Sequence, residues 1–237
     1  MTTMRAVIIA STACLVVGAA PQIHAQAVSN VDTKWLRTGV DTFKVSYAGN
    51  LLGHGITSRS RSGPTDASQL VQVYTWRDAQ GGWTVDSLFA DARSLATIRE
   101  VRLDADTLTA VTYTPTAIEV SVGDRKGGPV RKALVSASGV LSSATLDAIV
   151  ASSPLSSTFA REYRFFYAPP SKHGIVPVRV RVTGAERITD RAGRERETWV
   201  VAAATPSGGT VFWVDKETRA ILKYDTREGP AVIEFRR

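Results

Sequence analysis

The chain is built from short segments in which apolar and polar residues alternate, and turn-forming residues separate each segment from the next. In the first segment Phe43, Val45 and Tyr47 alternate with polar residues, and a glycine follows. Alternation with a period of two places the two sets of side chains on opposite faces of a strand, so the pattern predicts a mainly β fold whose sheet has one wet face. Further segments of this kind cover residues 69–76, 83–90, 97–103, 107–114, 117–122, 130–136, 159–167, 176–182, 198–205, 210–214, 220–225 and 231–236.

One segment departs from this pattern and predicts a single short helix over about residues 142–153. Ser142 is a candidate N-cap, and Leu146 begins an apolar stripe at helical spacing. Pro154 should end the helix, because the residue before a proline is pushed out of the helical region. A helix with one apolar stripe needs a sheet face to cover.

The first part of the chain has the three-part pattern of a secretory signal: an arginine near the start, an apolar run, and small residues at a cleavage site. We expect a signal peptide over residues 1–25, with cleavage after Ala25 or Ala27. The cut removes Cys14, the only cysteine, and leaves one domain over residues 28–237. The sequence therefore predicts a periplasmic or secreted protein without disulfides.

The formal net charge is +7 for the whole chain, and the predicted cut removes one arginine and no acidic residue, which leaves +6. Outside the cytoplasm a basic surface suits peripheral contact with anionic lipids, contact with acidic glycans, or solubility alone, and a basic surface without a dedicated partner is the preferred interpretation. No basic run with interleaved aromatic residues is present, so we expect no nucleic acid partner. The densest basic cluster, residues 187–196, also contains acidic residues and a glycine and is typical of a hairpin tip. Arg59 and Arg61 are assigned to the wet face of the sheet.

Residues for catalysis or metal binding do not form a pattern. Only His54 and His173 remain after cleavage, His54 between glycines typical of a turn, and no cysteine accompanies them, so we expect no transition-metal site. The Gly-x-Ser-x-Gly elbow of hydrolases and the glycine spacing of nucleotide sites are missing. The chain is thus expected to be neither an enzyme nor a cofactor-binding protein. Paired carboxylates stay open, because their proximity is tertiary; the candidates are Asp86, Asp91, Glu100 and Asp104.

The most distinctive stretch, residues 210–225, resembles the closing hairpin of the DUF3108 family of exported bacterial proteins. Its Phe212-Trp213-Val214 strand turns through an acidic and basic tip into Leu222-Lys223-Tyr224. The segments 47–53, 147–155 and 182–186 fit the same family. The resemblance implies a strongly curved, mostly antiparallel sheet, a half-barrel or open barrel. Similar hairpins occur in LolA/LolB-like envelope proteins, which bind lipid moieties, although the attachment cysteine of LolB-like proteins is missing here.

Three segments, 165–167, 199–202 and 211–214, are apolar on both faces and need cover on both sides. The predicted helix can shield only part of one face. We therefore expect an apolar groove or cavity lined by sheet residues and partly covered by the helix, with Trp213 buried. Candidate residues for the lining of the ligand site or core are Phe165, Tyr167, Trp199, Val201, Phe212, Trp213 and Val214.

Three hypotheses of function follow, in this order. The first is a non-enzymatic envelope protein that holds an apolar or lipid-like ligand, such as an acyl chain, inside the curved sheet. The second is a structural or interaction module with a filled core and a protein partner in the envelope. The third is a hydrolase acting on an envelope polymer, which would need a cleft with convergent polar groups of perturbed pKa.

Overall fold

The structure of the protein is a computed structural model that describes residues 28, 30–64, 68–168, 174–228 and 231–237. The expected signal peptide, residues 1–25, and both expected cleavage sites lie outside these residues, as does His173. Within the described ranges, no helix is long and apolar enough to cross a membrane.

The fold is one 15-stranded sheet, in which β1 lies in the middle between β2 and β15. Neighbouring strands are antiparallel except β9 and β10, which are parallel. The strands on one side of the sheet are β1 (Gly39–Tyr47), β2 (Asn50–Ser62), β3 (Gln69–Asp78), β4 (Trp83–Asp91), β5 (Thr97–Leu103), β6 (Thr107–Tyr113), β7 (Ala117–Asp124) and β8 (Arg131–Ser136). Those on the other side are β9 (Leu141–Ser142), β10 (Ala160–Tyr167), β11 (Gly174–Thr189), β12 (Glu195–Thr205), β13 (Gly208–Asp215), β14 (Ile221–Glu228) and β15 (Ala231–Arg236).

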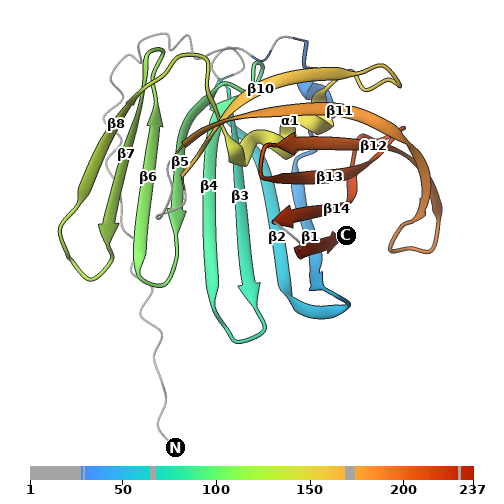
Figure 1. Ribbon diagram of the computed structural model, residues 1–237, viewed down its shortest axis with the longest axis horizontal. Coiled ribbons are helices and arrows are strands. Elements are labelled where there is room, and N and C mark those ends of the chain that lie inside the picture. Colours follow the sequence, from blue (N-terminus) through green and yellow to red (C-terminus); the bar gives the residue numbers. More distant parts are fainter. Residues whose placement is uncertain (1–27, 29, 65–67, 169–173, 229–230) are drawn as a thin grey trace, which may run out of the picture.

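The sheet is strongly curved and does not close into a barrel, since β8 and β9 are the two ends of the strand order. In Figure 1 strands β1–β8 run along one direction, strands β10–β14 run across them, and the helix α1 (Leu146–Ser152) lies within the curve. The mainly β fold, the single curved sheet and the one short α-helix confirm the fold expected from the sequence. The described residues also form two 3₁₀ turns, η1 (Thr33–Trp35) and η2 (Ser143–Thr145).

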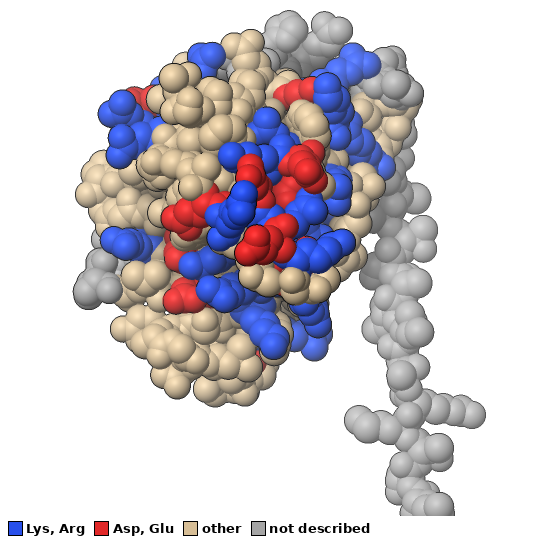
Figure 2. All heavy atoms as spheres, turned by 90° about the vertical axis from the view of Figure 1, so that its right-hand side faces the viewer, with Lys and Arg blue, Asp and Glu red and all other residues tan. Residues whose placement is uncertain are grey.

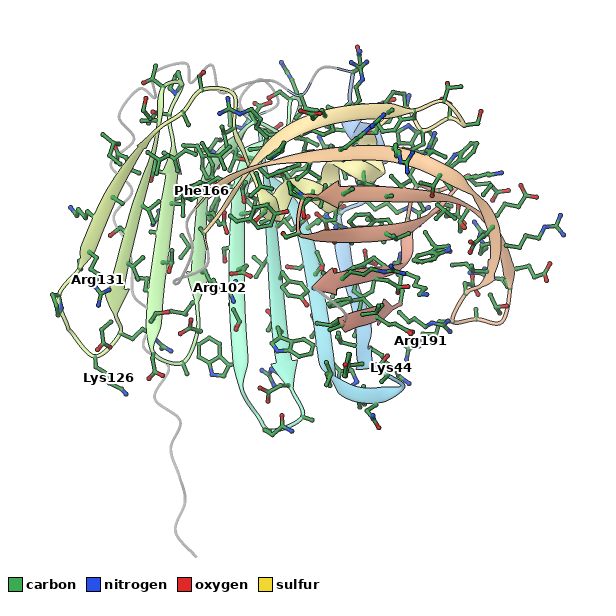
Figure 3. The ribbon with its side chains drawn as sticks, viewed as in Figure 1. Lys44, Arg102, Lys126, Arg131, Phe166 and Arg191 are labelled. Atoms are coloured by element: carbon green, nitrogen blue, oxygen red, sulfur yellow. The ribbon has the colours of Figure 1, made fainter. Side chains whose placement is uncertain are left out.

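The C-terminal end of strand β10, where the sequence is apolar over residues 165–167, is covered on both faces, as that sequence predicts. The side chains of Phe165 and Phe166 point to opposite faces, and both have 0% exposed surface. Phe165 belongs to the main core around α1, whereas Phe166 packs with residues of β6 and β7 and lies 6.4 Å from the Tyr113 ring, centroid to centroid. Figure 3 shows Phe166 where β10 crosses the strands of the other half. The sheet therefore curls over itself, and β10 forms its inner layer at this point.

The helix is shorter than expected. Ser142 accepts a hydrogen bond on Oγ from the Ala144 backbone N–H at 3.0 Å, which confirms it as a cap, but the turn that it caps is η2. Ser142 itself belongs to β9, because it pairs with Phe166 of β10, and its N–H also donates to Thr97 Oγ1 of β5 at 2.9 Å. The helix α1 ends at Ser152, and Ser153 is extended before Pro154, as predicted.

Strand β2 was not predicted, because glycine and serine are poor strand formers and suggested turns. His54, assigned to a turn, lies in this strand opposite Lys44 and Arg77, with its side chain exposed. The close approach of a neighbouring strand explains the glycine at position 53. A Cβ at Gly53 would lie 2.0 Å from the Arg77 carbonyl oxygen, so only glycine allows this approach of β2 and β3.

Trp213 is half-exposed on the outer face of β13, whereas the expectation was a buried ring. Its Nε1–H donates to Glu186 Oε2 at 2.7 Å, and Lys223 Nζ lies 4.2 Å from the ring centroid. Its neighbours Phe212 and Val214 point to the opposite, inner face and are buried. The apolar outer face of this strand is thus covered by long polar side chains and not by another layer.

This placement predicts a small effect for Trp213→Ala, about 1 kcal/mol in the free energy of unfolding, because the ring loses one hydrogen bond and one cation–π contact at a wet surface. Phe212→Ala, next to it in the chain, should cost about 3 to 5 kcal/mol, because it truncates a buried ring. Urea unfolding of both variants checks the contrast. Equal losses for the two variants would show that Trp213 is buried after all.

Candidate functional site

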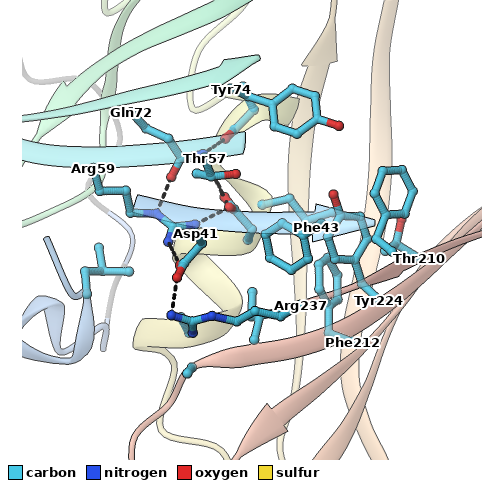
Figure 4. A pocket seen from close by; sticks show the side chains of 18 of the residues that line it. Asp41, Phe43, Thr57, Arg59, Gln72, Tyr74, Thr210, Phe212, Tyr224 and Arg237 are labelled. Carbon is cyan, nitrogen blue, oxygen red and sulfur yellow. Dashed lines mark hydrogen bonds and ion pairs between the residues drawn. The ribbon is translucent and has the colours of Figure 1, made fainter. Parts of the chain in front are cut away.

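A cavity of about 310 Å³ lies inside the curved sheet (Figure 4). Its walls come from β1–β4 on one side, from β13–β15 on the other, and from the η2–α1 segment, which contributes Ala144, Leu146 and Asp147. The cavity that the sequence predicts, lined by sheet residues and partly covered by the helix, is therefore present. Its lining is more polar than expected.

One wall of the cavity is aromatic. The Tyr224 ring stands at its centre, with ring centroids of Phe43 at 5.4 Å, Phe212 at 5.7 Å and Phe235 at 4.1 Å. These rings come from β1, β13, β14 and β15, and the Tyr224 and Phe235 rings are stacked across neighbouring strands. Leu88 and Leu146 extend the apolar lining. An apolar chain would meet ring faces and aliphatic carbons along this wall.

The opposite wall is a network of charged and polar side chains centred on Arg59 of β2. Arg59 Nε donates to Gln72 Oε1 at 2.6 Å, and the guanidinium forms ion pairs with Asp147 of α1 and, at 3.5 Å, with Asp41 of β1. Asp41 also pairs with Arg237. Gln72 Nε2 donates to Asp147 Oδ1 at 3.1 Å, and its side chain is buried. The network joins three strands to the helix and fixes the side of the cavity that the helix covers.

Two tyrosines join the walls. Burial raises the pKa of Tyr74 to about 12, against the effect of its hydrogen bond with Tyr224. Burial also raises the pKa of Tyr224 well above its usual range. Both phenols thus stay protonated and act as neutral hydrogen-bonding groups. The Tyr74 ring lies across Gly55, where an added Cβ would meet Tyr74 Oη at 2.8 Å, so Gly55 makes room for the ring.

Two carboxyls on the inner face are buried or half-buried. Asp86 lines the cavity, its Oδ1 has no hydrogen-bond partner among the described residues, and its Oδ2 lies 3.8 Å from Arg102 Nη1. Glu100, on the neighbouring strand, accepts hydrogen bonds from Ser142 Oγ at 2.6 Å and from Tyr113 Oη at 3.3 Å. Burial raises the pKa of both Asp86 and Glu100, and the charge of Asp86 raises that of Glu100 further.

A second, outer groove of about 900 Å³ lies under the β11–β12 hairpin and shares Arg37, Ala220 and Arg237 with the inner cavity. Among the charged residues of its lining the basic ones outnumber the acidic ones. The basic residues include Arg191, Arg194, Arg196, Lys223 and Arg236; the acidic ones are Glu186, Asp190 and Asp215. Figure 2 shows Lys and Arg side chains gathered with Asp and Glu on the face of the molecule that lies to the right in Figure 1. Three residues thus border both the cavity and a mostly basic groove.

The sequence matches the family described as "Protein of unknown function (DUF3108)" over residues 29–236. The chain belongs to the DUF3108 family. No curated protein matches it. A solved structure, a β-barrel-like protein with a domain of unknown function, DUF1849, from Brucella abortus, has a TM-score of 0.53 at 10% identity and covers 83% of this chain and 94% of its own. At this identity the likeness shows the fold alone, and it agrees with the curved sheet of the DUF3108 chain.

Of the seven residues predicted for the lining of the ligand site or core, Phe212 lines the cavity of this DUF3108 protein. Phe165, Val201 and Val214 are buried in the core around α1. Tyr167 and Trp199 are half-buried and pack against the same core. Trp213 lies on the outer face and borders the outer groove. Most of the seven predicted residues thus belong to the core or pack against it.

Sequence reasoning missed the polar wall. Arg59 was assigned to the wet face, but its side chain is only 13% exposed and points into the cavity. The error follows because strand β2 is not predicted from the sequence. Without that strand, nothing indicates the alternation that places the side chains of Thr57 and Arg59 on the inner face. A usable signal was present in β3, where Gln72 and Tyr74 share one face with the buried Leu70. Among the described residues, no group of three or more His, Cys, Asp or Glu is placed to hold a metal ion.

The raised pKa of Glu100 predicts a pH dependence of stability in this DUF3108 chain. Above the ordinary value of 4.5 the folded chain holds the proton more tightly than the unfolded chain, so the free energy of unfolding falls as the pH rises from 4.5 through the raised value. Glu100→Gln should remove the part of this fall that belongs to Glu100. Carboxyls with lowered pKa, such as Asp215, act in a separate window below 3.8.

Urea unfolding at pH 5 and pH 8 measures the effect. We expect wild type to lose more stability than Glu100→Gln between the two pH values. Glu119→Gln, at an exposed position on β7, is the matched control and should behave as wild type. The same pH response in wild type and Glu100→Gln would contradict the burial of this carboxyl.

Proposed function

We propose that this protein is an exported, non-enzymatic envelope protein that binds an apolar or lipid-like ligand in the cavity between the two halves of its sheet. The observation that carries the proposal is the unfilled space beside the Tyr224 aromatic cluster, in a protein whose neighbouring core residues Phe165, Val201 and Val214 have no exposed surface. A volume of about 310 Å³ is at the small end of ligand sites. It suits a single short chain and not a two-chain lipid.

Export rests on the signal pattern of residues 1–25. The basic outer groove adds a means of peripheral contact with anionic lipid surfaces. A lipid-like ligand and a membrane surface would then meet on the same side of the molecule, because the groove and the cavity share Arg37, Ala220 and Arg237.

Binding is tested with the neutral fluorescent probe N-phenyl-1-naphthylamine and its displacement by 1-octanol. Thr226 lines the cavity and faces Thr210 across the strands, with their Oγ1 atoms 3.2 Å apart, so Thr226→Phe places a ring in the space. We expect wild type to bind the probe and Thr226→Phe to bind it about tenfold more weakly or worse. Thr112→Phe, at an exposed position of β6, is the matched control and should bind as wild type. No binding by wild type, or equal binding by Thr226→Phe, would contradict the proposal.

One observation favours a second candidate, a hydrolase. Asp86 and Tyr74 both line the cavity and both have a raised pKa, which is the convergence expected of a catalytic cleft. It ranks second because the one described histidine, His54, is on the outer face, and because a phenol with a pKa of about 12 is a poor base at neutral pH. Turnover of p-nitrophenyl octanoate that is lost in Asp86→Asn would favour the hydrolase over the binding protein.

A further inference from the structure

Arg219 lies in the turn between β13 and β14 and lines the inner cavity. Its backbone has φ of 59°, a left-handed conformation, and its N–H donates to the Asp215 carbonyl at 2.9 Å. Asp215 holds the turn from within, because its carboxylate accepts hydrogen bonds from the N–H groups of Glu217 at 3.0 Å and Thr218 at 2.7 Å. The Arg219 side chain therefore starts from a well-fixed point of the wall.

The guanidinium of Arg219 has unmet hydrogen-bonding capacity. Its Nε and Nη1 atoms are buried and have no hydrogen-bond partner, and Arg219 forms no ion pair, among the described residues. Its Cζ lies 5.6 Å from the centroid of the Trp35 ring, a cation–π contact that leaves the N–H donors free. Burial lowers the pKa of Arg219, but an arginine remains charged at neutral pH.

The acidic residues of the cavity do not compensate this charge. Asp41 and Asp147 are engaged by Arg59 and Arg237. Asp86 lies on β4, and burial raises its pKa, which favours the neutral, protonated carboxyl. Buried charged donors in folded proteins are otherwise hydrogen-bonded, and a buried unpaired donor is costly. Arg219 thus lacks an acceptor in the cavity wall.

The position of this unpaired cation selects one class of ligand. Ala220, the next residue, borders both the inner cavity and the basic outer groove, so Arg219 lies close to where the two meet. Within the proposed lipid-binding function, we propose that the cavity takes a single-chain amphiphile whose anionic headgroup, a carboxylate or a phosphate, is hydrogen-bonded by Arg219. The chain extends along the aromatic wall at Phe43, Phe212 and Tyr224. Arg37, which is exposed and without an ion pair among the described residues, adds positive charge at the same end.

Calorimetric titration with three ligands of equal chain length tests this step: octanoate, monooctyl phosphate and 1-octanol. Because two or more charge-assisted hydrogen bonds form, wild type should bind at least one of the two anions about tenfold or more tightly than 1-octanol. The anion that binds more tightly identifies the headgroup. Arg219→Gln should lose this preference and still bind 1-octanol as wild type does, which shows that the cavity is intact. Arg77→Gln, an exposed arginine on the outer face of β3 without an ion pair among the described residues, should keep the preference.

The outcomes separate the headgroup from the cavity. Equal affinity of wild type for the anions and 1-octanol, or a preference that survives in Arg219→Gln, overturns the role of Arg219 and leaves the lipid-binding function standing. Failure of all three ligands to bind wild type overturns both. A parallel loss of anion and alcohol binding in Arg219→Gln, with its thermal unfolding unchanged, would show that Arg219 only maintains the shape of the cavity, and would overturn its role as headgroup ligand.

Discussion

Arg59→Ala is expected to lower the free energy of unfolding by about 3 kcal/mol, the cost of leaving partly buried charges without their partner. The Arg59 side chain is 13% exposed and is the one cation of its network that binds Asp147 of the helix as well as Asp41 of β1. Its removal leaves the Asp147 carboxylate without an ion pair among the described residues. Urea unfolding at neutral pH measures the loss.

Arg61→Ala is the matched control, since Arg61 lies on the same strand and the same face two residues later. Its side chain is exposed and donates to the Thr33 carbonyl at 2.6 Å, so the loss should be about 0.5 kcal/mol. If Arg59→Ala cost as little as Arg61→Ala, the Arg59 guanidinium would be in solvent and the polar wall of the cavity would be wrong.

Phe165→Ala is expected to cost about 4 kcal/mol, the range for truncating a fully buried aromatic ring. Phe165 has no exposed surface and belongs to the core that α1 covers, where its ring lies 6.0 Å from that of Tyr163. The variant leaves a void between β10 and the helix. It therefore tests whether the helix closes the inner layer of the sheet.

Phe89→Ala provides the comparison, because Phe89 is half-buried on the outer face of β4 and should cost about 1 kcal/mol. Urea unfolding of both variants gives the difference. A loss for Phe165→Ala as small as that for Phe89→Ala would show that β10 is covered on one side only.

The alternation of apolar and polar residues carries most of the fold. Strand β5 (Thr97–Leu103) has the bounds that the sequence predicts, and β15 (Ala231–Arg236) does too. The apolar character of residues 165–167 on both faces correctly predicts a strand between two layers. Such patterns can be recognised in a short segment, because each strand places the side chains of one face in the core, whichever strands it pairs with.

Long-range contacts explain what the sequence could not predict. The sequence of β2 predicts turns, because Gly53 and Gly55 are typical strand breakers. Both glycines are needed for contact with β3, since a side chain would collide with the Arg77 carbonyl at Gly53 and with the Tyr74 ring at Gly55. The apolar neighbours of Trp213 predict a buried ring, but the alternation of side chains along β13 places this ring on the outer face. Local sequence does not say which face of a continuous apolar run meets water.

The candidate site was predicted in part. A cavity beneath a short helix follows from the shortage of cover for apolar strands, and Phe212 was named among its lining. The polar wall joins residues up to 196 positions apart, because Asp41 pairs with Arg237 as well as with Arg59, and no local pattern marks such an ion network. The unpaired Arg219 becomes visible only once the cavity and the turn at Asp215 are both in place.

Native mass spectrometry of the protein purified from its own compartment, before and after solvent extraction, tests the binding function most directly. Wild type should show the mass of the mature chain plus one small ligand, and extraction should remove the added mass. Thr226→Phe, with the cavity filled by a ring, should show the mass of the chain alone. Wild type that has the mass of the chain alone before extraction, and that binds neither 1-octanol nor octanoate afterwards, would contradict the account.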